Sequence, residues 1–145
     1  MNNGRSLNTL RTLAAAAERE SSRLLAQRRQ ALDTEDQRLA QLRDYLSEYT
    51  AAQPTRDGIF IDSIRARRDF VAQICAGIKQ QEQIVASLQL QLEQDQQNWR
   101  DARSHALALE RYDERLQAVA DEKQSRREQA RLDEVGRQQH LARIA

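Results

Sequence analysis

The chain has 145 residues, of which 31% are charged and 4% are aromatic, and its 23 basic residues nearly balance its 22 acidic ones. This balance disfavours nucleic-acid binding, because a binding domain usually carries a basic excess on one face. The low apolar share disfavours a thick globular core. The chain has only 4 glycines and 1 proline, so its composition is typical of long helices. The composition therefore predicts an all-α protein.

The first predicted helix spans about residues 6–52, with Ser6 as its N-cap. Its apolar residues form two stripes that do not share one heptad register. A four-four step around Leu24, Arg28 and Leu32 joins them, which we interpret as a stutter that locally unwinds a coiled coil. The stripes are Leu7, Leu10, Ala14, Ala17 and Leu24, followed by Leu32, Leu39, Leu42, Leu46 and Tyr49.

A turn is predicted at residues 53–58, because this segment holds Pro54, the only proline, together with Gly58. Asp57 is a candidate N-cap for a second helix over about residues 59–138, which has no stop signal before Gly136. A short turn folds consecutive helices back on each other. The sequence therefore predicts a single domain over residues 1–145, a long antiparallel two-helix coiled-coil hairpin.

The second helix carries an apolar residue at alternating steps of four and three from Phe60 to Ala120. This spacing is that of the a and d positions of a coiled coil, here called the seam. Its polar members are Arg67, Gln81, Asp95 and Asp113. The full seam reads Phe60, Ile64, Arg67, Val71, Ile74, Ile78, Gln81, Val85, Leu88, Leu92, Asp95, Trp99, Ala102, Ala106, Leu109, Asp113, Leu116 and Ala120.

The second helix is expected to overhang the first at its C-terminal end. If Leu42 lies near Phe70, the start of the first helix lies near residue 106, and Leu109, Leu116 and Ala120 have no internal partner. The helix beyond them is polar and is supported by the pairs Glu122–Arg126 and Asp133–Arg137. A partly apolar stripe without an internal partner predicts an external one.

No catalytic or cofactor motif is recognised. The glycines are isolated, so there is no phosphate-binding loop, and His105 and His140 lack the spacing of metal ligands. Cys75 has no partner for a disulfide, which suits a reducing compartment. Because we also recognise no signal peptide and no membrane span, we expect a cytoplasmic protein without enzymatic activity, cofactor or metal.

Aromatic residues gather near the predicted turn. Tyr45 and Tyr49 are one helical turn apart on the face of Leu42, and Phe70 lies one position off the seam. Ile74, Gly77 and Gln81 follow Phe70 at helical spacing. Two interpretations stay open: the aromatic side chains thicken the hairpin near its turn, or they form a docking patch for another protein.

Several short motifs follow one another along the chain in a particular order and spacing. The first helix begins Leu7-x-x-Leu10-x-x-Leu13 and ends with Gln41-Leu-Arg-Asp-Tyr-Leu-Ser-Glu-Tyr49. Phe70-Val-Ala-Gln-Ile74 and Ile78-Lys-Gln-Gln81 follow the turn. The C-terminal motifs are Trp99-Arg, Leu109-Glu-Arg-Tyr-Asp-Glu-Arg115 and Glu128-Gln-Ala-Arg-Leu-Asp-Glu134. Together, in this order and across the whole chain, they resemble the flagellar type III export protein of the FliJ family.

The resemblance implies a stalk whose terminal end enters the hexameric ring of the export ATPase. It also implies contacts with export chaperones and with the cytoplasmic domain of the export-gate membrane protein FlhA, at the inner membrane of the flagellar base. The implied gate and chaperone patch is Leu42, Tyr45, Tyr49, Phe70, Ile74, Gly77 and Gln81. The implied ATPase-ring end is Leu7, Leu10, Leu109 and Leu116. A stalk used singly in a ring is expected to be monomeric when free.

Two alternatives stay open beside the flagellar stalk. The first is the equivalent stalk of a virulence type III secretion system, which shares the architecture. The second is a homodimeric coiled-coil spacer or secretion chaperone that does not contact an ATPase.

Overall fold

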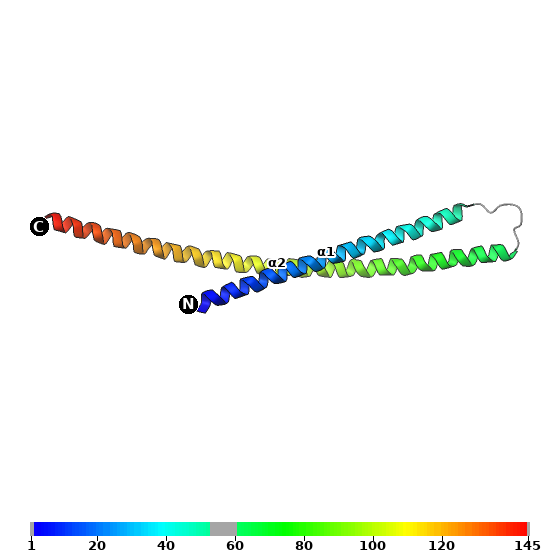
Figure 1. Cartoon of the computed structure of the whole chain (residues 1–145), viewed down its shortest axis with the longest axis horizontal. Helices are drawn as coiled ribbons and strands as arrows, with labels where there is room; N and C mark the ends of the chain where they lie inside the picture. Colours follow the sequence, from blue (N-terminus) through cyan, green and yellow to red (C-terminus); the bar gives the residue numbers. More distant parts are fainter. Residues whose placement is uncertain (1, 53–60, 145) are drawn as a thin grey trace. The chain divides into compact units, whose positions relative to one another are not determined.

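The computed structural model describes residues 2–52 and 61–144. These residues form two helices and no strand: α1 spans Asn2–Ala51 and α2 spans Ile61–Ile144 (Figure 1). The predicted all-α class, with two long helices packed against each other, is confirmed. The predicted turn at 53–58, the Asp57 cap and the seam position Phe60 lie outside the described residues.

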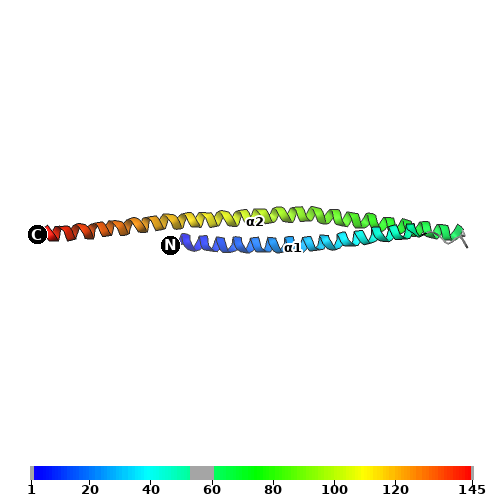
Figure 2. The same ribbon diagram turned by 90° about the horizontal axis from the view of Figure 1, so that it is seen from above.

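The helices are divided between two compact units. The middle unit is Arg19–Asp101, and the terminal unit combines Met1–Glu18 with Ala102–Ala145. In the middle unit the two helices run antiparallel side by side (Figures 1 and 2), since Arg43 pairs with Glu82 whereas Arg28 pairs with Asp95. The expectation of a single domain stays a prediction.

Both helices extend further than the sequence signals indicate. α1 begins at Asn2, so Ser6 lies inside the helix and is not its N-cap. α2 continues through Gly136 to Ile144. A glycine inside a helix costs only about 1 kcal/mol relative to alanine, and both Arg137 and Gln138 donate hydrogen bonds to the Glu134 carboxylate across this position. Gly136 therefore does not end the helix.

The core of the middle unit is one residue deep. Leu25 is buried at 6% exposure, and four further buried residues form one cluster, Leu39, Ile74, Ile78 and Val85, each between 6% and 9% exposed. Leu32, Leu42, Leu46 and Phe70 pack around them, so Leu42 and Phe70 meet in the same cluster as expected. Such a narrow layer is typical of a coiled-coil seam.

The predicted stutter in α1 is wrong, because the covered residues of this helix follow a single heptad register. They are Leu7, Arg11, Ala14, Glu18, Ser21, Leu25, Arg28, Leu32, Glu35, Leu39, Leu42, Leu46 and Tyr49, with Ala15 beside them. The register passes through Leu25, whereas Leu10 and Leu24 are 51% and 43% exposed. The apparent break arose because α1 places polar residues at several seam positions and apolar residues beside the seam.

The predicted seam of α2 is confirmed from Arg67 to Asp113, where every seam residue is buried or half-buried. Ile64 and Leu116, just outside this span, are 47% and 46% exposed. Leu109, which we expected to be uncovered, is half-buried, and in the terminal unit Arg11 of α1 contacts Asp113. The contact with α1 therefore reaches further along α2 than the sequence indicated.

The polar seam residues of the two helices pair with each other. In the middle unit Gln81 Nε2 donates to the backbone oxygen of Glu35 at 3.0 Å, and Arg28 Nε lies 2.9 Å from Asp95 Oδ2. In the terminal unit Arg11 Nη1 lies 3.3 Å from Asp113 Oδ2. A shift of one heptad would leave these groups without their partners, so they specify the register of the pairing.

Candidate protein-docking surfaces

An aromatic cluster formed by Tyr45, Tyr49 and Phe70 joins α1 to the first turns of α2. The Tyr49 and Phe70 ring centroids are 4.8 Å apart, and the Tyr45 and Phe70 rings meet edge to face at 6.2 Å. Tyr45 and Tyr49 are 6.5 Å apart along α1. Offset and edge-to-face rings attract each other, so the cluster stabilises this end of the middle unit whether or not a partner binds there.

Arg67 completes the aromatic cluster by capping α1. Its Nη2 donates to the backbone oxygens of Tyr49 at 3.2 Å and Ala52 at 2.7 Å. Its guanidinium carbon also lies 5.5 Å from the centre of the Tyr49 ring. A cation at the C-terminal end of a helix satisfies the last carbonyls and interacts favourably with the helix dipole. Arg67 therefore stabilises the end of α1 and the helix pair.

The predicted gate and chaperone patch divides into exposed and covered members. Tyr45 is 48% exposed, whereas Ile74 is 8% exposed and belongs to the core. Leu42, Tyr49, Phe70, Gly77 and Gln81 are half-buried. A partner at this patch would contact chiefly Tyr45 and the outer edges of Tyr49 and Phe70.

Gly77 and Gln81 are explained differently by the structure. A side-chain carbon added at Gly77 would have no atom within 4 Å, so no close approach inside the chain requires this glycine. Gln81, by contrast, bonds across the helix pair, since its Nε2 also donates to Glu35 Oε2 at 2.5 Å. Its position is accounted for by helix pairing.

The residues predicted for the ATPase-ring end lie in the terminal unit and also differ in exposure. Leu7 is 9% exposed and Leu109 is half-buried, so both pack between the helices. Leu10 and Leu116 are 51% and 46% exposed. Close to Leu116 in sequence, Tyr112 and Val119 are 49% and 50% exposed and follow helical spacing with it. Tyr112, Leu116 and Val119 form the exposed stripe of the terminal unit.

Arg11 links the two helices of the terminal unit. Its Nη2 and Nε contact Glu110 at 2.9 Å and 3.2 Å, and its Nη1 contacts Asp113. The hydrogen bond to Glu110 is the largest cause that raises the pKa of Arg11 above its ordinary value. Burial, the next cause, lowers the pKa, and the charges of Asp113, Glu110 and Glu114 raise it. The sequence reading missed this residue, although its four-three spacing from Leu7 and Ala14 was a usable signal.

Residues 114–144 of α2, here called the tail, are all exposed. The predicted pair of Glu122 with Arg126 is present at 2.6 Å. Arg137, however, pairs with Glu134 instead of Asp133. Local ion pairs of this kind support a solvated helix by a few tenths of a kcal/mol each.

Two features are absent from residues 2–52 and 61–144. Within this part of the chain, no three His, Cys, Asp or Glu residues are grouped so that they could hold a metal ion. Neither described helix contains an apolar stretch long enough to cross a membrane. The features that stand out are the exposed side chains of the aromatic cluster and of the exposed stripe.

The fold and these surfaces define a protein of two long packed helices, each of which leaves apolar side chains exposed. The family model of the flagellar FliJ protein matches residues 3–144. The chain therefore belongs to the flagellar FliJ protein family, a family of non-enzymatic components of flagellar type III export. A search of individual curated proteins finds no match to this sequence.

Proposed function

We propose that this chain is the coiled-coil stalk of a flagellar export ATPase and that its terminal unit enters the ATPase hexamer. The exposed stripe of Tyr112, Leu116 and Val119 carries the proposal. Leu116 continues the seam beyond Asp113, the last residue of α2 that α1 covers, and Tyr112 and Val119 lie beside the seam. An apolar stripe on a single helix is stabilised when a partner covers it. Membership of the FliJ family supports the ATPase ring as that partner.

The stalk would act by geometry rather than by catalysis. A single asymmetric helical element in a near-symmetric ring contacts the subunits unequally, which favours ring assembly and couples their turnover. The free protein is accordingly a monomer in the cytoplasm, recruited to the inner membrane at the flagellar base. The match to the flagellar family favours this role over a virulence-system stalk or a spacer.

The test is to mix the purified protein with the export ATPase and to measure ring assembly by electron microscopy and ATP turnover. The double variant Leu10→Glu/Leu116→Glu is expected to abolish any stimulation. Leu90→Glu is the matched control, since Leu90 is 68% exposed in the middle unit. If the unaltered protein promotes neither ring assembly nor turnover, the stalk proposal is wrong.

We further propose that the aromatic cluster docks on the cytoplasmic domain of the export gate and on export chaperones. Tyr45 offers the exposed aromatic surface, and Tyr49 and Phe70 hold it in place. Aromatic anchors of this kind dominate many protein interfaces.

Binding of the gate domain to Tyr45→Ala, measured by calorimetry, is expected to be at least about tenfold weaker. Tyr112→Ala is the control, because Tyr112 is 49% exposed and Tyr45 is 48% exposed. If Tyr45→Ala and Tyr112→Ala keep their helicity and bind the gate domain equally well, the proposed docking of the aromatic cluster is wrong. The proposed entry of the terminal unit into the ATPase ring would not be affected.

A further inference from the structure

Arg11 holds the terminal part of α1 on α2 through contacts with two carboxylates, here called the clasp. Its Nε lies 3.2 Å from Glu110 Oε1 and its Nη2 lies 2.9 Å from Glu110 Oε2. Its Nη1 reaches Asp113 Oδ2 at 3.3 Å. A guanidinium that meets both oxygens of one carboxylate forms one of the stronger kinds of ion pair. The clasp lies near the end of the helix pairing, since Asp113 is the last residue of α2 that α1 covers.

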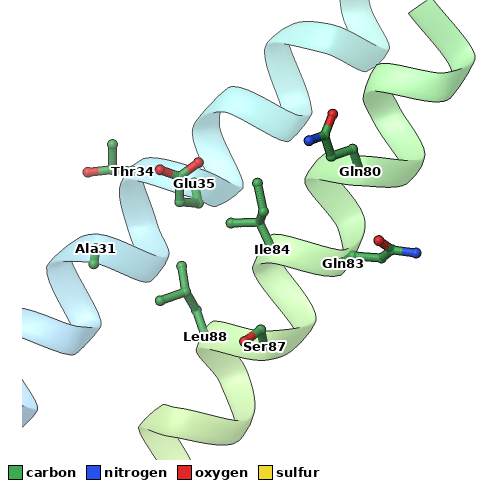
Figure 3. Close-up of a pocket in the computed structure, with 8 residues that line it drawn as sticks. All are labelled: Ala31, Thr34, Glu35, Gln80, Gln83, Ile84, Ser87 and Leu88. Atoms are coloured by element: carbon green, nitrogen blue, oxygen red, sulfur yellow. The ribbon is translucent and has the colours of Figure 1, made fainter.

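Apolar packing around the clasp is slight. Among the described residues of the terminal unit, the buried ones are Leu7, Ala14 and Ala106, two of which are alanines. In the middle unit, by contrast, larger side chains such as Ile84 and Leu88 of α2 extend toward α1 (Figure 3). Because hydrophobic stabilisation grows with the apolar area that is buried, packing holds the terminal part of α1 less strongly than the middle part. The ion pairs of Arg11 therefore contribute a larger share of the pairing here.

The clasp remains in contact with water. The side chains of Arg11, Glu110 and Asp113 are 29%, 47% and 37% exposed. Dissolved salt screens such charges, because the Debye length falls from about 10 Å at 0.1 M to about 3 Å at 1 M ionic strength. Apolar packing has no such dependence on screening. Pairing in the terminal unit is therefore expected to weaken with salt, unlike pairing in the middle unit.

The segment of α1 that the clasp holds, residues 2–18, is not fixed on α2 by its apolar pattern. Leu7 is covered, whereas Leu10 and Leu13 are 51% and 61% exposed. A helix with apolar residues on more than one face can pack in more than one way. The charged residues of the segment are Arg5, Arg11 and Glu18. Arg11 is therefore the group that best distinguishes the observed pairing from its alternatives.

Release of residues 2–18 would enlarge the apolar surface of α2. Ala106 is buried and Leu109 is half-buried, and both lie on the seam shortly before Leu116, which is 46% exposed already. Without α1 above them, Ala106 and Leu109 would join Leu116 in one longer stripe. Such an opening leaves the core of the middle unit intact, so it is a local event that precedes global unfolding.

We propose that Arg11 is a salt-sensitive clasp that reversibly holds residues 2–18 of α1 on α2, and that its release uncovers Ala106 and Leu109. The clasp is a property of the free chain and does not depend on the proposed entry into an ATPase ring. Within that proposed function, release presents a longer apolar stripe to the ring.

The test is hydrogen–deuterium exchange of the full chain, followed by mass spectrometry, at about 0.1 M and about 1 M sodium chloride. In the unaltered protein, the backbone amides of residues 6–18 are expected to exchange at least about threefold faster at the higher salt. Arg11→Gln is expected to show the faster exchange already at the lower salt and to lose most of the salt dependence. Exchange in the middle unit is expected to stay the same.

Two further variants separate the clasp from a general effect of charge removal. Arg23→Gln is the matched control, because Arg23 also lies on α1 but pairs with Glu20 of the same helix. It is expected to keep both the exchange rates and the salt dependence of residues 6–18. Arg11→Leu/Asp113→Leu replaces the clasp with an apolar seam contact. It is expected to slow exchange of residues 6–18 and to abolish the salt dependence.

Three results would overturn the proposal. The first is exchange of residues 6–18 that does not change with salt in the unaltered protein. The second is a salt dependence in Arg11→Gln equal to that of the unaltered protein. The third is an equal acceleration in residues 6–18 and in the middle unit, since the helices would then separate along their whole length at once.

Discussion

α2 is one continuous helix whose two regions are stabilised in different ways. From Arg67 to Asp113 each seam residue is at least half-buried, whereas in the tail all residues are exposed. The first region is helical and also paired, because an apolar layer is covered. The tail is helical through local interactions such as the pair of Glu122 with Arg126. Helix formation and helix pairing are therefore separate properties of this chain.

The largest expected effect comes from truncating a core residue. Ile74→Ala removes a side chain that is 8% exposed, and we expect it to lower the free energy of unfolding by about 2–3 kcal/mol through lost burial and a cavity. Leu132→Ala in the tail, where Leu132 is 68% exposed, should change it by less than about 0.5 kcal/mol. Urea unfolding followed by circular dichroism measures both. Equal losses would refute the contrast between the regions.

The second effect comes from breaking an ion pair in each region. Asp95→Ala leaves Arg28 without its seam partner, and the Asp95 side chain is 15% exposed. We expect a loss of about 1–2 kcal/mol, because a covered charge then lacks its counter-ion. Glu122→Ala breaks a pair whose side chains are 62% and 78% exposed, so it should cost at most a few tenths of a kcal/mol. Chemical denaturation measures the free energy of unfolding of both variants. A larger loss from Glu122→Ala than from Asp95→Ala would contradict the view that the tail is stabilised only locally.

The third effect uses two glycines with open surroundings. An added methyl group at Gly77 or Gly136 would meet no atom within 4 Å, so alanine should stabilise the helix at each by about 0.5–1 kcal/mol. Gly77→Ala should raise the free energy of global unfolding, since its region is paired. Gly136→Ala should slow amide exchange in the tail alone. A rise in global stability from Gly136→Ala would show that the tail unfolds together with the core.

The smallest effect concerns the ion pair of Glu20 with Arg23, which lies within α1. The hydrogen bond from Arg23 lowers the pKa of Glu20 below its ordinary value, against a smaller rise from burial. A depressed folded-state pKa means that this pair stabilises the protein at neutral pH and that the contribution is lost as pH falls through that pKa. Carbon-detected NMR titration should show the Glu20 pKa return toward its ordinary value in Arg23→Gln. An unchanged pKa would exclude Arg23 as its cause.

The register of α1 shows where sequence reasoning failed. The sequence pattern assigned Leu10 and Leu24 to the seam of α1, because apolar residues usually define a seam. In the structure the seam runs through Arg11 and Leu25 instead. Arg11 occupies a seam position because it forms ion pairs with Glu110 and Asp113 of the other helix. A polar residue is admitted to a seam when the opposite helix supplies its partner, and a single helix pattern does not reveal that partner.

The sequence by itself determined the helices and most of one seam. The regular spacing from Arg67 to Asp113 predicted both the covered face of α2 and its polar members, because a period of 3.5 residues fits a coiled coil. The scarcity of glycine and proline predicted two long helices. The tertiary structure alone decided which α1 residues face that seam, how far the pairing extends, and that Leu24 and Ile84 remain on the surface beside it. The physical reason is that helix formation depends on neighbours within a few residues, whereas burial and ion pairing depend on residues of the other helix far along the chain.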